Sequence, residues 1–411
     1  MEQYDVVIIG GGIAGSAVAA RLAAADLTVL VLERQTVYRD KVRGEYMHLW
    51  GVAEMQRLGL EQVLLDAGGS YAQALVSFGE GIDPSLAIAD GLPLGMFLPD
   101  VPGALCVGHP QASEALNSHA EQRGACVVRG VGDVEMVVVV AGAAPLVRYE
   151  LDGNVIEATC RLIVGADGRQ STVRRALNIP MHQIESKAVL GGMLVQAPEW
   201  QMTGAFTGNE DDRYFLGFPR KGGLVRLYLA CEPGTARSGP DRTQQMLDGF
   251  RLASVPDSEL LANAEPIGPC SYYPGTDAWV DQPAVDGAVL IGDAAGWSDP
   301  IIGEGLSVAM RDARSVADVL LAGDDWSVAA FQPYATERAE RMRRLRLAAH
   351  VTTELRCTFT AEGHQRRVAF RDQMMTDPLI LGLMLSQLIG PETGPEESFD
   401  DSNVERILAL A

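Results

Sequence analysis

The chain has 411 residues, of which 47% are apolar and 21% charged, so it is long enough for one large globular core or two ordinary ones. The formal net charge of −21 argues against nucleic acid or an anionic membrane as a main partner. The six cysteines show no C-x-x-C pair and no Cys/His metal spacing, so we expect reduced thiols, a cytoplasmic location and no metal site. The longest late apolar run, residues 378–389, is too short to span a bilayer, and we expect no transmembrane segment.

The first predicted elements are a strand, a helix and a second strand near the N-terminus. Residues 6–9 form a short β-branched apolar run, as in a strand that is buried on both faces. Residues 16–25 are rich in Ala with Leu and Arg, which favours a helix, and residues 28–32 are apolar again. A glycine-rich turn joins the first strand to the helix, and this order of elements is typical of a dinucleotide-binding unit.

The turn itself reads GGGIAG and places Gly10, Gly12 and Gly15 at the G-x-G-x-x-G spacing. In such a unit the first glycine permits the turn, the second lets a pyrophosphate approach the backbone, and the third lets the helix pack close to the strand. The helix N-terminus offers free N–H groups to the phosphates, and Glu33, at the end of the second strand, can accept hydrogen bonds from a ribose diol. The sequence therefore predicts a bound dinucleotide here.

The next part of the chain alternates between helices and short strands. Residues 35–69 hold a basic loop and then a helix that ends near Gly59, and residues 70–104 are predicted as short strands and turns. Residues 108–124 are predicted as a helix with apolar residues at helical spacing, and residues 125–164 as strands alternating with turns.

The second half of the chain begins with strands and ends with helices. Residues 185–275 are rich in strand patterns, which we interpret as a mixed sheet that covers a pocket. Residues 288–322 predict a strand followed by a clear helix, and the chain is mostly helical from residue 326. Residues 334–350 carry arginines on several faces, so we expect a solvated helix beside the core.

These elements predict an α/β fold class, with a doubly wound, Rossmann-like cofactor domain, an interleaved mixed β-sheet substrate domain and a helical C-terminal region. Because the chain returns to α/β character after the β-rich insert, we expect the first domain to be discontinuous. The expected ranges are 1–70, 105–184 and 276–325 for the cofactor domain, 71–104 and 185–275 for the β-rich substrate domain, and 326–411 for the C-terminal region.

Two further motifs follow strand-like runs. In residues 162–177 an apolar strand ends just before Asp167, and polar residues follow at helical offsets. In the later motif a strand ends at Asp293, and an acid at the carboxyl end of a strand points into the ligand crevice of a doubly wound sheet, where it can bind a polyol. The Gly303–Gly305 turn can then present backbone N–H groups and a helix N-terminus to developing negative charge.

In this order and spacing the three motifs resemble those of the flavoprotein monooxygenases of the p-hydroxybenzoate hydroxylase type, over roughly residues 1–325. The resemblance implies FAD as the cofactor, NADH or NADPH as co-substrate, and O2 as the oxidant. It further implies a C4a-hydroperoxyflavin that oxygenates a small aromatic or polycyclic natural-product-like substrate. No second G-x-G-x-x-G is present, so the nicotinamide is expected to dock transiently, unless a separate flavin reductase supplies the electrons.

The resemblance also implies individual cofactor contacts. Those expected at the pyrophosphate and the adenosine are Gly10, Gly12, Ile13, Ala14, Gly15, Glu33, Arg34, Arg43 and Val134. Asp167 belongs to the family's Asp-Gly motif, which is associated with FAD and NAD(P)H, and Asp293 would hold the ribityl chain. The residues expected at the pyrimidine edge of the isoalloxazine are Gly303, Gly305, Leu306 and Ser307.

A substrate pocket is expected between the FAD-binding domain and the β-rich insert. Its candidate residues are Tyr46, His48, Trp50, Tyr214, Phe218 and Trp297, with ordinary packing as the alternative for the first three. We assign no catalytic acid or base, because no Ser/His/Asp arrangement and no pair of carboxylates is visible in the sequence.

Two alternative functions stay open. The motif GDAAG…P..GEG resembles that of geranylgeranyl reductases, and residues 214–220 are partly similar to their Y-x-W-x-F-P-K substrate motif, which favours an FAD-dependent reductase or dehydrogenase. The stretch RGEYMHLW is faintly similar to flavin-dependent halogenases. The halogenase G-W-x-W-x-I-P motif is absent, however, and no lysine occurs between residues 41 and 187, where that family keeps its catalytic one.

Overall fold

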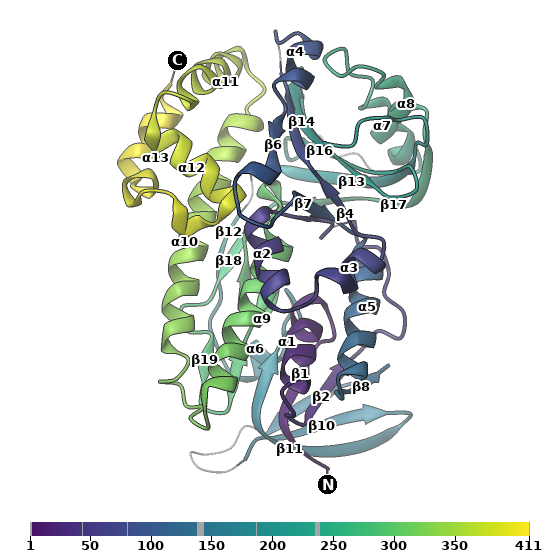
Figure 1. Cartoon of the computed structure of the whole chain (residues 1–411), viewed down its shortest axis with the longest axis vertical. Helices are drawn as coiled ribbons and strands as arrows, with labels where there is room; N and C mark the ends of the chain where they lie inside the picture. Colours follow the sequence, from purple (N-terminus) through teal and green to yellow (C-terminus); the bar gives the residue numbers. More distant parts are fainter. Residues whose placement is uncertain are drawn as a thin grey trace.

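The computed structural model describes residues 2–42, 44–79, 81–137, 144–185, 187–234 and 239–410. Two large sheets organise these residues, and Figure 1 shows the first sheet at the end that carries the N-terminus. The second sheet lies at the opposite end, beside the C-terminal helices (Figure 1). The α/β fold class expected from the sequence is confirmed.

The first sheet has eight strands and is largely parallel. Its main path runs β19 (Ala284–Val285), β20 (Ala288–Leu290), β11 (Asn154–Gly165), β1 (Glu2–Ile9), β2 (Val29–Glu33) and β8 (Cys126–Arg129), with β10 (Leu146–Leu151) on β11 and β9 (Val134–Val137) on β10. Strand β1 pairs in parallel with β11 and β2. The carboxyl ends of these parallel strands therefore meet at one edge, where the predicted motifs lie.

Strand β1 is buried on both faces, as its apolar run predicts. Val6 and Ile8 join the large core that also contains helices α1 (Ile13–Ala23), α5 (His109–Gln122) and α9 (Gly305–Ala322). Val7 and Ile9 point to the other face and join a second cluster beneath β10. Successive side chains of a strand alternate between faces, so a continuous apolar run requires a layer on each side.

The second sheet has seven strands and is mixed. Strands β14 and β5 pair in parallel, and all other neighbouring strands of this sheet pair antiparallel. Its order is β17 (Glu265–Pro274), β13 (Val189–Gln196), β16 (Leu224–Cys231), β15 (Arg213–Arg220), β14 (Ala205–Glu210), β5 (Ala74–Phe78) and β6 (Leu92–Pro93). Helices α7 (Arg242–Asp248) and α8 (Glu259–Ala262) contribute to the core on one face. Strands β5 and β6 thus share one sheet with strands that come more than 90 residues later in the chain. The expected domain limits stay predictions.

Strand β15 shows how the second sheet joins the two halves of the molecule. Tyr214 and Phe218 belong to the large core that contains α1 and α9. Phe215, on the opposite face, belongs to the core of the β-rich part. The alternation along one strand therefore places an aromatic face against the half of the molecule that contains α1 and α9.

Smaller elements connect these layers. Two three-stranded sheets are formed by β3 (Tyr46–Met47), β7 (Ala104–Cys106) and β4 (Ser70–Ala72), and by β12 (His182–Ile184), β18 (Asp277–Trp279) and β21 (Gly296–Trp297). The shorter helices are α2 (Leu49–Arg57), α3 (Glu61–Asp66), α4 (Pro84–Ala89), η1 (Leu94–Met96), α6 (Thr172–Ala176), η2 (Gly292–Ala295) and η3 (Pro300–Ile302). Helix α2 packs against α9, which carries the loop around Gly303 at its start.

The C-terminal region is helical, as predicted. It comprises α10 (Gln332–Arg356), α11 (Ala361–Met374), α12 (Pro378–Ile389), η4 (Pro391–Thr393), η5 (Glu396–Phe399) and α13 (Asp401–Leu408). Within the described part of the chain, no helix has both the length and the apolar character needed to cross a membrane.

The expectation of a solvated helix over residues 334–350 is wrong for one face of α10. Arg338 and Arg341 are only 2% and 3% exposed. The side chain of Asp312, on α9, accepts a hydrogen bond from each of them at 2.9 and 2.7 Å. A buried acid on a neighbouring helix allows these arginines to be buried, because the ion pairs and hydrogen bonds offset the loss of hydration.

Candidate functional site

The glycine turn between β1 and α1 has the close contacts that its spacing predicts. Gly10 has a φ of +106°, and a Cβ atom there would lie 2.4 Å from the Ala166 carbonyl oxygen. A Cβ atom at Gly15 would lie 1.9 Å from the Gly10 carbonyl oxygen. At Gly12, by contrast, a Cβ atom would meet no described atom within 4 Å. Two glycines are therefore needed for packing, and the third leaves the backbone open to a ligand.

Glu33 fixes this turn from the end of β2. Its Oε2 atom accepts a hydrogen bond from the Gly11 N–H and its Oε1 atom from the Gln35 N–H, both at 2.7 Å. Each oxygen of a carboxylate can accept a second hydrogen bond, so the predicted role toward a ribose remains compatible with this geometry. Arg34, next in the chain, is exposed.

Two residues that the sequence analysis did not identify also hold the turn. The Gly11 carbonyl oxygen accepts hydrogen bonds from the Tyr38 hydroxyl at 2.5 Å and from the Asn117 Nδ2 at 2.6 Å. Asn117 is a polar residue on the buried face of α5. A polar residue on an apolar helix face was the available signal, because buried amides need partners.

The second motif is built around Asp167, which follows β11. Its Oδ2 atom accepts hydrogen bonds from the N–H groups of Thr172 and Val173 at 2.6 and 3.1 Å, at the start of α6. Its Oδ1 atom is buried and has no hydrogen-bond partner among the described residues. Val134 lies on another strand, β9, where it pairs with Tyr149 of β10.

The second and third motifs meet at Asp293. This residue lies in η2, after β20, and its Oδ2 atom accepts a hydrogen bond from the Arg169 Nε at 3.2 Å. The Arg169 guanidinium also lies over the Trp297 ring, 5.1 Å from its centre. The Asp293 side chain is 35% exposed and remains accessible to a ligand. The sequence did not identify Arg169, whose role arises only when the two strand ends come together.

The Gly303 turn leads from η3 into α9. Gly303 has a left-handed φ of +68°, and a Cβ atom there would lie 3.5 Å from His48 Nε2. A Cβ atom at Gly305 would meet no described atom within 4 Å. Gly305, Leu306 and Ser307 form the first turn of α9, where backbone N–H groups have no acceptor within the helix. The turn thus offers N–H groups and room for a ligand edge.

The substrate-pocket candidates fall into two groups. Tyr46 stacks on Phe218 with ring centres 4.6 Å apart, and His48 meets the edge of Tyr46 at 4.8 Å. These three residues lie together beside the Gly303 turn. The others lie outside this stack: Trp50 lies beside Glu304 and under the Arg311 guanidinium, Tyr214 lies near the guanidinium of Arg356, and Trp297 lies beside Arg169. The candidate Arg43 lies outside the described residues.

Burial shifts several pKa values beside this turn. Burial lowers the pKa of His48 to about 4, although the hydrogen bond to the Ile302 carbonyl opposes that shift. Burial raises the pKa of the Tyr46 phenol above its ordinary value. Burial also raises the pKa of Glu304, between the two glycines, well above its ordinary value. At neutral pH His48 and Tyr46 are therefore uncharged, and burial favours the protonated form of Glu304.

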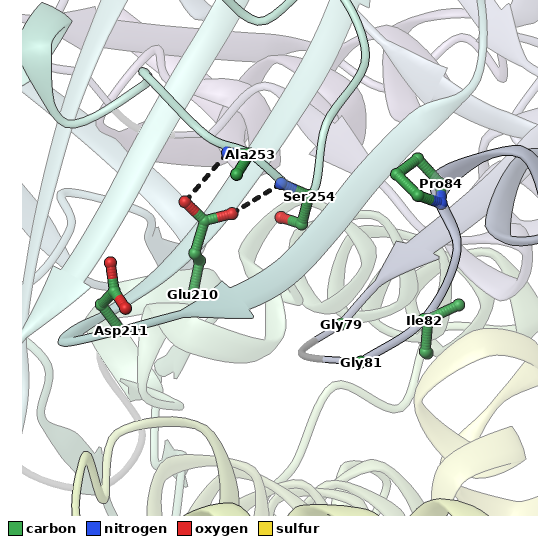
Figure 2. A pocket seen from close by; sticks show the side chains of 8 residues that line it. All are labelled: Gly79, Gly81, Ile82, Pro84, Glu210, Asp211, Ala253 and Ser254. Atoms are coloured by element: carbon green, nitrogen blue, oxygen red, sulfur yellow. Dashed lines mark hydrogen bonds between the residues drawn. The ribbon is translucent and has the colours of Figure 1, made fainter.

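A separate hollow of about 350 Å³ lies in the β-rich half. Figure 2 shows its lining residues, which are Gly79, Gly81, Ile82, Pro84, Glu210, Asp211, Ala253 and Ser254. The Glu210 carboxylate faces this hollow, but it accepts hydrogen bonds from the N–H groups of Ala253 and Ser254 at 3.0 and 2.7 Å. These bonds hold a loop, and none of the motif residues lines the hollow. The cofactor and substrate candidates therefore belong to the other site.

The residues at the carboxyl edge of the first sheet fit a flavin dinucleotide. The open backbone at Gly12 suits a pyrophosphate, the accessible carboxylate of Asp293 suits a polyol, and the open turn at Gly305 suits a ring edge. The three features lie in the chain order of the three sequence motifs. We therefore take this edge as the candidate cofactor site.

Comparison with known proteins agrees with this fit. A family model described as an FAD binding domain matches residues 3–347. Rifampicin monooxygenase of Streptomyces venezuelae is 27% identical over 358 residues, an alignment that covers 79% of this chain and 66% of that enzyme. Menaquinone reductase of Mycolicibacterium smegmatis is 26% identical over 329 residues, covering 78% of this chain and 77% of that enzyme.

Among solved structures, p-nitrophenol 4-monooxygenase from Pseudomonas putida has a TM-score of 0.78 at 18% identity, covering 95% of this chain and 99% of that one. At this identity the likeness establishes the fold alone. The family model matches most of the chain, and this match establishes the family to which the chain belongs. The chain belongs to the FAD-binding family of flavoproteins of the p-hydroxybenzoate hydroxylase type and is an FAD-dependent oxidoreductase.

Proposed function

We propose that the protein is an FAD-dependent monooxygenase that oxygenates a small aromatic or polycyclic substrate. One observation carries the proposal: the Gly303 turn, where the flavin edge is expected, lies against Tyr46, whose ring stacks on Phe218. A flat apolar substrate held by these rings would lie beside the flavin. When bound, FAD would supply oxygen activation, with electrons from NADH or NADPH or from a separate flavin reductase.

The chain's own residues then have defined tasks. The first turn of α9 would donate backbone hydrogen bonds to negative charge at the flavin edge. Asp293 would hold the polyol chain, with Arg169 fixing its carboxylate. The aromatic face made by Tyr46, Phe218 and Tyr228 would exclude water from the substrate side, because all three rings are buried and Phe218 contacts the other two.

The test supplies the holoenzyme with NADH or NADPH, isotopically labelled O2 and a panel of phenols and polycyclic aromatic compounds. We expect substrate-stimulated NAD(P)H oxidation and one labelled oxygen atom in the product. Rapid mixing of the reduced holoenzyme with O2 should also show a distinct spectral species between reduced and oxidised flavin. Reoxidation that never incorporates label into any substrate, with only peroxide released, would contradict the proposal.

A matched pair of substitutions on β15 locates the substrate. Phe218→Leu removes a ring from the face toward the cofactor half, whereas Phe215→Leu removes one from the opposite face. We expect Phe218→Leu to raise the substrate KM and the fraction of peroxide released. Phe215→Leu should lower stability and leave both quantities near their original values. Equal effects on KM would place the substrate elsewhere.

A second candidate function is supported by the similarity to menaquinone reductase. Residues 214–220, which are partly similar to the substrate motif of geranylgeranyl reductases, form β15 and place Tyr214 and Phe218 toward the cofactor half. A reductase of apolar isoprenoid substrates would use the same aromatic face. Anaerobic turnover of an isoprenoid quinone or alkene with reductant, without any oxygen requirement, would favour this function over oxygenation.

A further inference from the structure

Glu304 is a buried acid that the proposed chemistry does not use. It lies between Gly303 and Gly305 in the Gly303 turn, where the flavin edge is expected, and is 0% exposed. Neither of its carboxyl oxygens has a hydrogen-bond partner among the residues that the structure describes. An ionised carboxylate without partners in such a place would cost several kcal/mol, so the geometry favours the protonated form.

The side chains around Glu304 come from both packed helices and from β3. The buried Trp50 indole and Ser307 hydroxyl lie beside the carboxyl. As neutral hydrogen-bond donors they lower the pKa of Glu304, but they do not outweigh the effect of its burial. Gly51 on α2 lets α9 come this close, because a Cβ atom there would lie 2.5 Å from the Ser307 Oγ. The Tyr46 hydroxyl is also buried and unpartnered in the same part of the structure. These groups enclose the acid.

His48 is the nearest titratable neighbour. Its Nε2 atom lies 3.9 Å from Glu304 Oε1 and 2.8 Å from the Ile302 carbonyl oxygen. Because a carbonyl oxygen can only accept, Nε2 carries the hydrogen and donates it to Ile302. Burial keeps the ring neutral at neutral pH by lowering its pKa to about 4. His48 therefore supplies no positive charge to ionise Glu304.

The nearest arginines are already engaged by other acids. Arg311 donates hydrogen bonds to Glu54 and Glu392 at 3.1 and 2.8 Å. Arg341, on α10, donates to Asp312 at 2.7 Å and to Glu337 at 2.9 Å. Their charges lower the pKa of Glu304, but they offset only part of the effect of its burial. Among the residues that the structure describes, Glu304 thus has no direct counter-ion.

We propose that Glu304 is held as an uncharged carboxylic acid behind the flavin turn, and that loss of its proton as the pH rises lowers the reduction potential of bound FAD. The proposal rests on the flavin position given under the proposed function. A carboxylate formed there would repel the negative charge that reduced flavin develops at its pyrimidine edge. Glu304 acts as a positioning residue, through the electrostatic potential of the turn.

The test measures the FAD midpoint potential of the holoenzyme by spectroelectrochemical titration from neutral to alkaline pH. Wild type and Glu304→Gln should have the same potential at neutral pH, because glutamine is a neutral isostere of the protonated acid. As the pH rises, the wild-type potential should fall below that of the variant. A constant offset at every pH, or coincidence up to the alkaline limit of the folded holoenzyme, would overturn the proposal.

Glu54→Gln is the matched control on the facing helix. Glu54 is also buried, but it accepts hydrogen bonds from two arginines, Arg311 and Arg314. Its substitution should shift the potential by a similar amount at every pH. The potential measurement needs bound FAD but no substrate. If substrate oxygenation fails, the inference on Glu304 can therefore still be tested separately.

An infrared measurement keeps the proposal testable if Glu304→Gln does not retain FAD. The folded wild type in heavy water should show a protonated-carboxyl band at neutral pH, and Ser307→Ala should shift that band because it removes the adjacent hydroxyl. The band should persist unshifted in Glu54→Gln. A spectrum in which neither Glu304→Gln nor Ser307→Ala changes any protonated-carboxyl band would contradict an uncharged Glu304.

Discussion

Two acids at the start and in the middle of α9 are equally buried but have different hydrogen-bond and charge partners. Asp312 and Glu304 are both 0% exposed. Asp312 accepts hydrogen bonds from Arg338, Arg341 and the Gly292 N–H at 2.7–2.9 Å. Glu304 directly precedes α9, and its carboxyl oxygens have no well-aligned hydrogen bond among the described residues.

This difference shifts the pKa values of the two acids in opposite directions. Burial acts to raise the pKa of Asp312, but the adjacent arginines outweigh it and lower the pKa below the ordinary value. At Glu304 burial prevails and the pKa rises. The comparison shows that burial alone does not define the role of an acid. Hydrogen bonds from two arginines make Asp312 a structural ion. Glu304 has only neutral donors beside it in the described part of the chain, so its proton can respond to its surroundings.

The largest effect is expected at the structural acid. Asp312→Asn leaves Arg338 without its acidic partner and Arg341 with Glu337 alone, and should lower the free energy of unfolding by about 3–5 kcal/mol. Chemical denaturation of the holoenzyme measures this change. Asp318→Asn is the control on the same helix, because its pair with Arg314 is exposed, and it should change stability by less than about 1 kcal/mol. Equal losses would remove the distinction between the two kinds of ion pair.

The next effect concerns the accessible acid of the third motif. Asp293→Ala removes a charged acceptor without opening the core and should weaken FAD binding by roughly tenfold to a hundredfold. Fluorescence titration of the apoprotein with FAD measures this change. Asp286→Ala, in the exposed loop before the same strand, is the control and should bind FAD normally. An unchanged FAD affinity in Asp293→Ala would contradict its assignment to the ribityl chain.

A smaller effect is expected on the pH dependence of stability. Because the pKa of Glu304 is raised in the folded state, its contribution to stability is complete below the unfolded pKa and is lost as the pH rises through the folded pKa. Glu304→Gln cannot titrate, so it should match wild type in acid and become relatively more stable toward alkaline pH. Denaturation curves at several pH values check this. A variant that is less stable by the same amount at every pH would indicate a charged Glu304.

The smallest effect is expected at Asp277. Burial raises the pKa of Asp277 to about 7, and the backbone hydrogen bond from Asp299 opposes that rise. Its stabilising contribution is therefore lost as the pH rises toward about 7, and Asp277→Asn should remove only this part of the slope. Thermal unfolding measured against pH separates it from Glu304, because the slope above neutral pH should persist in Asp277→Asn. Loss of the alkaline slope in that variant would reverse the two assignments.

The cofactor edge could be predicted from sequence because its parts depend on near neighbours in the chain. A glycine turn must follow a buried strand wherever backbone and ligand approach closely, and an acid at a strand's carboxyl end faces the crevice. The predictions for Gly10, Gly15 and Asp293 required no knowledge of the rest of the fold. Arg169, Tyr38 and Asn117 were missed because their partners come from other segments of the chain.

The sequence by itself thus determined the strand, turn and helix conformations of the three motifs, since steric limits and helix propensity act over a few residues. Only the tertiary structure decided which charged side chains are paired. The sequence pattern predicts Arg338 as a solvated helix residue, yet the side chain is buried. It donates hydrogen bonds to the Asp312 carboxylate and to the carbonyl oxygens of Gly292, Ala295 and Gly296. The sequence pattern around Glu304 is that of an ordinary loop acid, yet the approach of α2 to α9 buries it with no counter-ion among the described residues. Electrostatic energy depends on distance in space, and the distance along the chain does not fix it.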